Sequence, residues 1–391
     1  MKIDAHSNVI DSEYERYTAF CDKAERGCWI FGAGTIGRRI MRVLEKFPIF
    51  AISGFIDNDT HKVGGYIGNY QILSIKQYQK NFWGDAILIG TQDVAKEKIV
   101  EQLENIGLTE NIDYCTDIDK LLGIVAYKKN KELYIQLTQI CVTERCTLKC
   151  KKCAHGCNYV DMRQEDMDIG EVISTTDAFF KIVDFCRDFV FIGGEPLLYK
   201  YLDKAIDYVG REYSSKIGRM SITTNGTILP SKSVLEMCKK YDVEFSISNY
   251  EMAIPNLEDK YRKLSEMLDK YQIEYMMHRD MEWTDYGFGT YRSDADEKEL
   301  EKIFDECSTI CHESRGKRFY FCVMARSVSD NMNLKVGKED YLDISQLCGD
   351  DGKRMFLEYS LGYLEKGYLD MCAYCRGKDR FRYPIPAGEQ M

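Results

Sequence analysis

Short apolar segments alternate with longer amphipathic segments along most of this chain of 391 residues, and this alternation limits the possible folds more than any other feature. A first series lies before about residue 130, where "CWIF", "FAISGFI" and "AILIG" are separated by helical patterns. Strands that alternate with helices form parallel sheets. A second series has apolar segments at 133–143, 189–194, 219–226, 243–249 and 273–278. About five repeats are too few for a closed eight-stranded barrel, so we expect a partial, open α/β barrel.

These patterns predict three regions in an α/β chain. Residues 1–130 are expected to form a Rossmann-like parallel sheet, and residues 131–290 a partial (β/α)6-type barrel. After about residue 290 the pattern changes to a charged helical segment followed by a hairpin that carries cysteines. Residues 291–391 are therefore expected to form a small α+β extension.

The composition limits the partners of the protein. Apolar residues make up 45% of the chain, which is typical of globular proteins, and the formal net charge of −10 argues against a general nucleic-acid binder. The first residues lack a basic stretch followed by an apolar core, and no apolar run approaches the ~18 residues of a membrane span. We therefore expect a cytoplasmic protein with no membrane span and no nucleic-acid partner.

Sixteen cysteines need an explanation in such a protein, because clustered thiols in a reducing compartment bind metals or take part in redox chemistry. Cys146, Cys150 and Cys153 have the spacing C-x3-C-x2-C and directly follow the strand predicted at 133–143. Structural zinc takes four ligands, whereas three thiolates suit a 4Fe–4S cluster with one iron left open. The loop follows a strand, at the end where α/β barrels build their active sites.

Polar or small residues also end the next three predicted strands. The segments are "GGEP", "TTNG" and "SISN", and together they contain the candidate binding residues Gly193, Gly194, Glu195, Thr224, Asn225 and Ser246. Glycines let a backbone approach a ligand closely, a carboxylate can accept from an amine, and hydroxyl and amide groups suit a ribose.

In this order, "CTLKCKKC", "GGEP", "TTNG" and "SISN" resemble the radical S-adenosylmethionine (SAM) superfamily across about residues 134–280. The resemblance implies that Cys146, Cys150 and Cys153 ligate a 4Fe–4S cluster whose fourth iron binds SAM. It further implies that Gly193, Gly194 and Glu195 contact the SAM amine, and that Thr224, Asn225 and Ser246 contact its ribose or carboxylate. Many members have an aromatic residue before the third cysteine, where this chain has Lys152.

A second set of cysteines follows the predicted barrel. The segment "CHESRGKRFYFC" predicts a hairpin that brings Cys311 near Cys322, and "CAYC" adds Cys372 and Cys375. Four thiols can close a zinc site. The resemblance to radical SAM enzymes with a SPASM or twitch extension implies an auxiliary iron–sulfur cluster instead, with Cys307 as the spare thiol.

The segment "IFGAGTIGRR" contains G-x-G-x-x-G as Gly32, Gly34 and Gly37, between an apolar strand and a helix. Asp57 ends the next predicted strand. This pattern predicts a nucleotide or nucleotide-sugar site, with a phosphate at the helix N-terminus and a ribose on the acid. The alternative is a fold that uses these glycines only for packing. The region resembles small Rossmann-like domains found beside sugar-modifying enzymes.

The resemblances together imply a radical SAM enzyme of the oxidoreductase or epimerase type, acting on a nucleotide-activated or glycan-linked sugar. It would take electrons from a donor such as flavodoxin or ferredoxin. Trp283, Asp285 and Tyr286 are candidates for the substrate pocket. Two alternatives are a peptide-modifying radical SAM maturase and a non-enzymatic, metal-binding redox sensor that binds a nucleotide.

Overall fold

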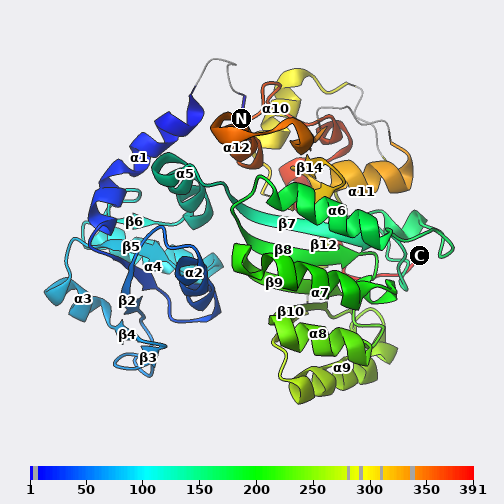
Figure 1. Ribbon diagram of the computed structural model, residues 1–391, viewed down its shortest axis with the longest axis horizontal. Helices are drawn as coiled ribbons and strands as arrows, with labels where there is room; N and C mark the ends of the chain where they lie inside the picture. Colours follow the sequence, from blue (N-terminus) through cyan, green and yellow to red (C-terminus); the bar gives the residue numbers. More distant parts are fainter. Residues whose placement is uncertain (3–7, 280–281, 290–293, 309–310, 335–339) are drawn as a thin grey trace. The chain divides into compact units, whose positions relative to one another are not determined.

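The computed structural model describes residues 1–2, 8–279, 282–289, 294–308, 311–334 and 340–391 (Figure 1). The chain divides into two compact units: one is Asn8–Tyr134, and the other is Ile135–Met391 with the first residues of the chain. Both units combine helices with parallel strands, which confirms the predicted mixed α/β fold. No helix in these ranges is both long and apolar enough to cross a membrane.

The unit Asn8–Tyr134 is built on a six-stranded sheet with the order β3-β4-β2-β1-β5-β6, parallel except for β3. Trp29 and Phe31 of β1 belong to one buried apolar cluster and Ile30 to another, so successive side chains pack on opposite faces. Burial on both faces is the reason why this strand reads as a continuous apolar run. Its strands are β1 Cys28–Phe31, β2 Ile52–Ile56, β3 Tyr66–Ile67, β4 Tyr70–Leu73, β5 Ala86–Ile89 and β6 Tyr114–Cys115. Its helices are α1 Val9–Ala24, α2 Thr35–Lys46, α3 Ile75–Asn81, α4 Asp93–Asn105 and α5 Ile118–Asn130.

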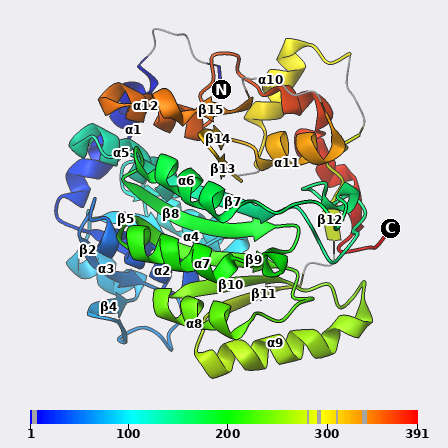
Figure 2. The same cartoon turned by 45° about the vertical axis from the view of Figure 1, so that its right-hand side comes forward.

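The other unit contains an eight-stranded sheet with the order β11-β10-β9-β8-β7-β13-β14-β15, in which the strands from β8 to β11 pair in parallel. Figure 2 shows α6, α7, α8 and α9 side by side along one face. The strands are β7 Tyr134–Thr143, β8 Phe185–Gly193, β9 Ile217–Thr224, β10 Val243–Ser248 and β11 Tyr275–His278. The helices are α6 Ile169–Phe180, α7 Leu202–Tyr213, α8 Lys232–Tyr241 and α9 Glu258–Tyr271. Closure of these strands into a partial barrel stays a prediction.

The region after residue 290 continues the same sheet. The predicted hairpin is present, since β13 and β14 pair antiparallel around Gly316 and Lys317, and β13 also pairs with β7. For this reason the structure joins 291–391 to the strands from β7 to β11 in one compact unit. The remaining elements are β12 Glu282–Thr284, α10 Glu297–Asp305, β13 Glu313–Arg315, β14 Arg318–Tyr320, α11 Val323–Met332, β15 Leu342–Asp343, α12 Gly349–Ser360 and β16 Pro384–Pro386.

Candidate active site

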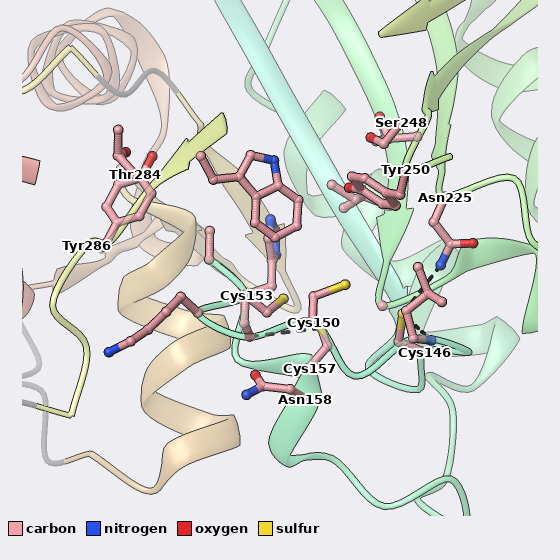
Figure 3. Close-up of a pocket in the computed structure, with 18 of the residues that line it drawn as sticks. Cys146, Cys150, Cys153, Cys157, Asn158, Asn225, Ser248, Tyr250, Thr284 and Tyr286 are labelled. Carbon is pink, nitrogen blue, oxygen red and sulfur yellow. Dashed lines mark hydrogen bonds between the residues drawn. The ribbon is translucent and has the colours of Figure 1, made fainter. Parts of the chain in front are cut away.

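A cavity of about 500 Å³ lies where the carboxyl ends of β8, β9 and β10 meet the loop after β7. Parallel strands bring their carboxyl ends to one edge of a sheet, which explains why loops far apart in sequence share this space. Figure 3 shows Cys150, Cys153 and Cys157 between Ser248 and Tyr250 on one side and Thr284 and Tyr286 on the other, with Cys146 on the side of Asn225. The lining includes Cys146, Cys150, Cys153, Cys157, Asn158, Gly193, Gly194, Thr224, Asn225, Ser248, Tyr250, Glu282, Trp283, Thr284, Tyr286, Arg380 and Phe381.

The three cysteines of the C-x3-C-x2-C motif all face this cavity, and donors are directed at their sulfur atoms. Cys146 Sγ accepts from the Leu148 N–H at 3.5 Å, and Cys150 Sγ accepts from Gln390 Nε2 at 3.2 Å. Burial raises the pKa of Cys146 to about 12 and that of Cys150 to about 11. A hydrogen bond from the Cys157 thiol is the main cause that lowers the pKa of Cys153 below its ordinary value.

This donor set fits an iron–sulfur cluster. Three thiols of one loop face a single cavity, and hydrogen bonds to sulfur are the contacts by which proteins tune such clusters. The cysteines are not gathered around a point. Across the residues that the structure describes, no group of three or more His, Cys, Asp or Glu side chains is placed to hold a single metal ion.

The glycines at the end of β8 are explained by packing against the start of the cysteine loop. A Cβ atom on Gly193 would lie 2.3 Å from the Thr143 carbonyl oxygen, and one on Gly194 would lie 2.4 Å from that of Arg145. The Gly194 N–H donates to Thr143 O at 2.8 Å, and the Glu195 N–H donates to Arg145 O at 2.8 Å. The two glycines line the cavity and also hold the cysteine loop beside β8.

Glu195 lies behind the cavity wall. Its carboxylate is fully buried and accepts from Thr224 Oγ1 at 2.7 Å and from the Asn225 N–H at 2.8 Å. Burial raises its pKa to about 7. In this geometry the carboxylate fixes the end of β9. Its predicted contact with the SAM amine stays a prediction.

The three candidates for ribose or carboxylate contacts are placed differently. Thr224 and Asn225 line the cavity, and Asn225 Nδ2 lies 3.5 Å from Cys146 Sγ. Ser246 is not among the lining residues, and its Oγ lies 3.1 Å from His278 Nε2. Ser248 takes the place at the cavity, because it lies two residues further along β10, at the carboxyl end of the strand.

Several cavity residues come from segments in which we predicted no site. Asn158, Tyr250, Arg380 and Phe381 lie in irregular segments or short 3-10 helices, where side-chain direction has no period that a sequence reveals. Trp283 and Tyr286, expected in the substrate pocket, line the cavity. Asp285 instead pairs with Lys152 at 3.2 Å and Arg376 at 2.6 Å, and these contacts hold its pKa below the usual range despite burial. The lysine that replaces the usual aromatic residue thus holds a second segment of the cavity wall.

The second set of cysteines is also brought together. Cys311 and Cys322 are bridge partners at the ends of the hairpin. Burial raises the pKa of Cys322, and the charges of Cys375, Cys307 and Cys372 raise it further. Cys307, expected to be spare, therefore lies within electrostatic range of the same group. The set Cys311, Cys322, Cys372 and Cys375 stays the predicted ligand set.

The glycine motif of the first unit forms the predicted strand–loop–helix turn between β1 and α2. Gly32 has a φ of 115°, and a Cβ on Gly37 would lie 1.9 Å from the Gly32 carbonyl oxygen, whereas one on Gly34 would meet no atom within 4 Å. Asp57 is buried, and its carboxylate accepts from the Ala33 N–H at 2.7 Å and the Asp59 N–H at 2.8 Å. This carboxylate holds the glycine loop, and a ribose contact stays a prediction.

Two models of known protein families match parts of this chain. The model of the radical SAM superfamily matches residues 140–271, and the model described as C2185-like, N-terminal matches residues 24–112. The first match covers about a third of the chain and supports the predicted radical SAM domain there. An uncharacterized protein of Methanocaldococcus jannaschii, MJ0907, is 31% identical over 108 residues, which are 27% of this chain and 36% of that protein. The chain thus matches only about a third of the length of this relative.

Solved structures resemble the chain at low identity. BtrN in complex with AdoMet and 2-DOIA is 18% identical with a TM-score of 0.37, covering 65% of this chain and all of that one. anSMEcpe with bound AdoMet and Cp18Cys peptide is 22% identical with a TM-score of 0.30, covering 36% of this chain and 42% of that one. SuiB of Streptococcus suis, bound to its precursor peptide SuiA, is 21% identical with a TM-score of 0.28, covering 47% and 44%. These similarities do not assign a substrate.

Proposed function

We propose that this chain is a radical SAM enzyme that oxidises or epimerises a sugar, either nucleotide-activated or linked to a glycan. The observation that carries the proposal is the cavity at the strand ends, into which Cys146, Cys150 and Cys153 face within a domain that matches the superfamily. When bound and reduced, the cluster supplies the electron that cleaves SAM to methionine and a 5′-deoxyadenosyl radical, which abstracts hydrogen from the substrate.

The chain contributes binding and orientation. The three thiolates would hold three irons of the cluster and leave the fourth accessible from the cavity. Gly193, Gly194, Thr224 and Asn225 would surround SAM at the strand ends. Buried residues behind them, such as Glu195, fix these ends.

The cavity wall formed by residues 282–286 would suit a substrate rich in hydroxyl groups. Trp283 and Tyr286 offer aromatic faces, while Glu282 and Thr284 offer hydrogen-bonding groups on the same segment. Rings with polar neighbours suit sugars, whose faces are apolar and whose edges carry hydroxyls. The Rossmann-like first unit would bind a nucleotide or a nucleotide sugar. An auxiliary iron–sulfur cluster on Cys311, Cys322, Cys372 and Cys375 would accept an electron from the substrate radical.

Anaerobic analysis of the purified chain tests this proposal. We expect about eight irons per chain with sulfide, two clusters of four, and 5′-deoxyadenosine when dithionite and SAM are added. Replacing Cys146, Cys150 and Cys153 with Ala should abolish 5′-deoxyadenosine formation, whereas Cys348→Ala, an exposed thiol outside both sets, should not. Cys372→Ala with Cys375→Ala should retain some SAM cleavage and lose the product.

A panel of nucleotide sugars then identifies the substrate by the dependence of 5′-deoxyadenosine release on one of them. Iron-free chain with one or two zinc ions, or SAM cleavage that persists in the triple cysteine variant, would contradict the proposal. Release that depends on a peptide instead of a sugar would favour the maturase alternative.

A further inference from the structure

Residues 384–391, which we call the covering segment, lie against the cysteine loop. The Lys151 N–H donates to Glu389 O at 2.6 Å, and the Met391 N–H donates to Lys149 O at 2.8 Å. Cys150 and Gln390 are antiparallel bridge partners. Main-chain hydrogen bonds therefore hold the covering segment beside the second cysteine of the motif.

The covering segment is also fixed on its other side. Its strand β16 pairs antiparallel with β12, so that Ile385 lies opposite Trp283 of the cavity wall. Gly388 has a φ of 73°, and a Cβ there would lie 2.7 Å from the Tyr250 ring, so the turn before Gln390 closely contacts the cavity residue Tyr250. The position of Gln390 is thus set from both directions.

The side-chain amide of Gln390 joins the loop through both of its ends. Its Oε1 accepts from the Lys149 N–H at 2.8 Å, while its Nε2 donates to Gly388 O at 2.6 Å and to Cys150 Sγ at 3.2 Å. Since Lys149 N can only donate and Gly388 O can only accept, these contacts allow one orientation of the amide. That orientation directs an N–H at the sulfur.

We propose that Gln390 is a positioning residue for the iron–sulfur cluster, which orients Cys150 and donates a hydrogen bond to its thiolate. This inference rests on the proposed function of the cavity. A hydrogen bond to a ligating sulfur stabilises the more negative, reduced state of a cluster and raises its reduction potential. Gln390 would therefore make the electron transfer to SAM depend on a segment about 240 residues away from the motif.

Three variants of the full chain test this role. Gln390→Leu keeps a similar size without hydrogen bonds, and Gln390→Glu keeps the acceptor for Lys149 but cannot donate to Cys150. Glu389→Gln is the matched control in the covering segment, since it removes only the half-exposed ion pair between Glu389 and Lys151 of the cysteine loop. The first readout uses apoprotein: we expect iodoacetamide to alkylate Cys150 several-fold more slowly in Gln390→Leu than in wild type, by peptide mass spectrometry, because loss of the donated hydrogen bond disfavours the reactive thiolate. The rate in Glu389→Gln should equal that of wild type.

The second readout is the midpoint potential of the reconstituted cluster whose EPR signal responds to SAM. It should shift to a more negative value in Gln390→Leu and further in Gln390→Glu, and stay at the wild-type value in Glu389→Gln. If the Gln390 variants match wild type in either readout, the inference is overturned while the proposed function stands. If a variant takes up no iron, the alkylation rate of Cys150 decides. A wild-type chain without any SAM-responsive cluster would overturn the proposed function, and this inference with it.

Discussion

Glu195 is a buried acid whose direct partners are neutral donors. Besides Thr224 and Asn225, the Leu197 N–H donates to it at 3.1 Å. Burial raises its pKa from 4.5 to about 7, although these hydrogen bonds act in the opposite direction. The folded chain therefore favours the protonated acid. The stabilising effect is complete below the unfolded pKa of 4.5 and is lost as the pH rises through about 7.

This titration predicts how the variant Glu195→Gln behaves. At pH 4.5 the variant should be less stable than wild type, because its amide nitrogen cannot accept from the Asn225 N–H. The difference in the free energy of unfolding should narrow as the pH rises to 7.5, since only wild type loses stability over this range. The loss is about 3 kcal/mol, because each unit of pKa shift corresponds to roughly 1.4 kcal/mol. Urea unfolding of apoprotein at several pH values measures this. A difference that is independent of pH would show that Glu195 titrates normally.

A buried charge network links three elements at the start of the cysteine loop. Arg326 of α11 pairs with Glu144, which follows β7, and with Glu313 of β13, and all three side chains are buried. Burial opposes ionisation of both acids, yet Arg326 and its other partners hold the pKa of Glu144 below the usual range, while that of Glu313 rises to about 7. Asn331 of α11 donates to Glu144 and to the His155 carbonyl, so α11 contacts both ends of the loop.

Replacing Arg326 with Met should therefore destabilise the chain by about 3–5 kcal/mol, because Glu144 would remain buried without its cation. The control Arg262→Met removes exposed pairs with Asp259 and Glu266 and should leave the free energy of unfolding nearly unchanged. Chemical denaturation of both variants gives the comparison, and iron content after reconstitution should fall only in Arg326→Met. Adding Glu144→Gln should recover part of the loss. Equal stability of the two variants would contradict the role of the network.

The network also shows what a sequence does not reveal at this scale. Strands and helices were predictable because apolar residues recur with the period of each element, and the strand ends located the cysteines, Thr224 and Asn225 at one cavity. Pairings between distant segments have no period. The pairings of Arg326 with Glu144 and of Gln390 with Cys150 depend on how irregular segments fold back. The motif predicts Ser246, whereas Ser248 lines the cavity, because a motif does not specify which residue of the strand end faces the cavity.

At the scale of the whole molecule, the chain contains two compact units with separate sheets. The unit Asn8–Tyr134 has its own apolar clusters, and residues near its ends pack within it: Phe20 lies against Phe50 and Tyr134 against Phe47. A unit with its own core can fold without the remainder of the chain. The glycine loop of this unit is therefore accessible to experiments that do not depend on iron or SAM.

We expect a fragment of residues 8–134 to fold alone and to unfold cooperatively in urea. Within it, Gly37→Ala should lose about 1–3 kcal/mol, because the new Cβ would overlap the Gly32 carbonyl oxygen. Gly34→Ala should change stability by less than about 1 kcal/mol, since a Cβ there meets no atom. If the loop binds a phosphate group, Gly34→Ala should nevertheless weaken binding of UDP-glucose in calorimetry, because the methyl group occupies the helix N-terminus. Loss of stability in both variants would contradict the difference in packing between Gly34 and Gly37. If the wild-type fragment binds none of a panel of nucleotides, the glycines serve packing alone.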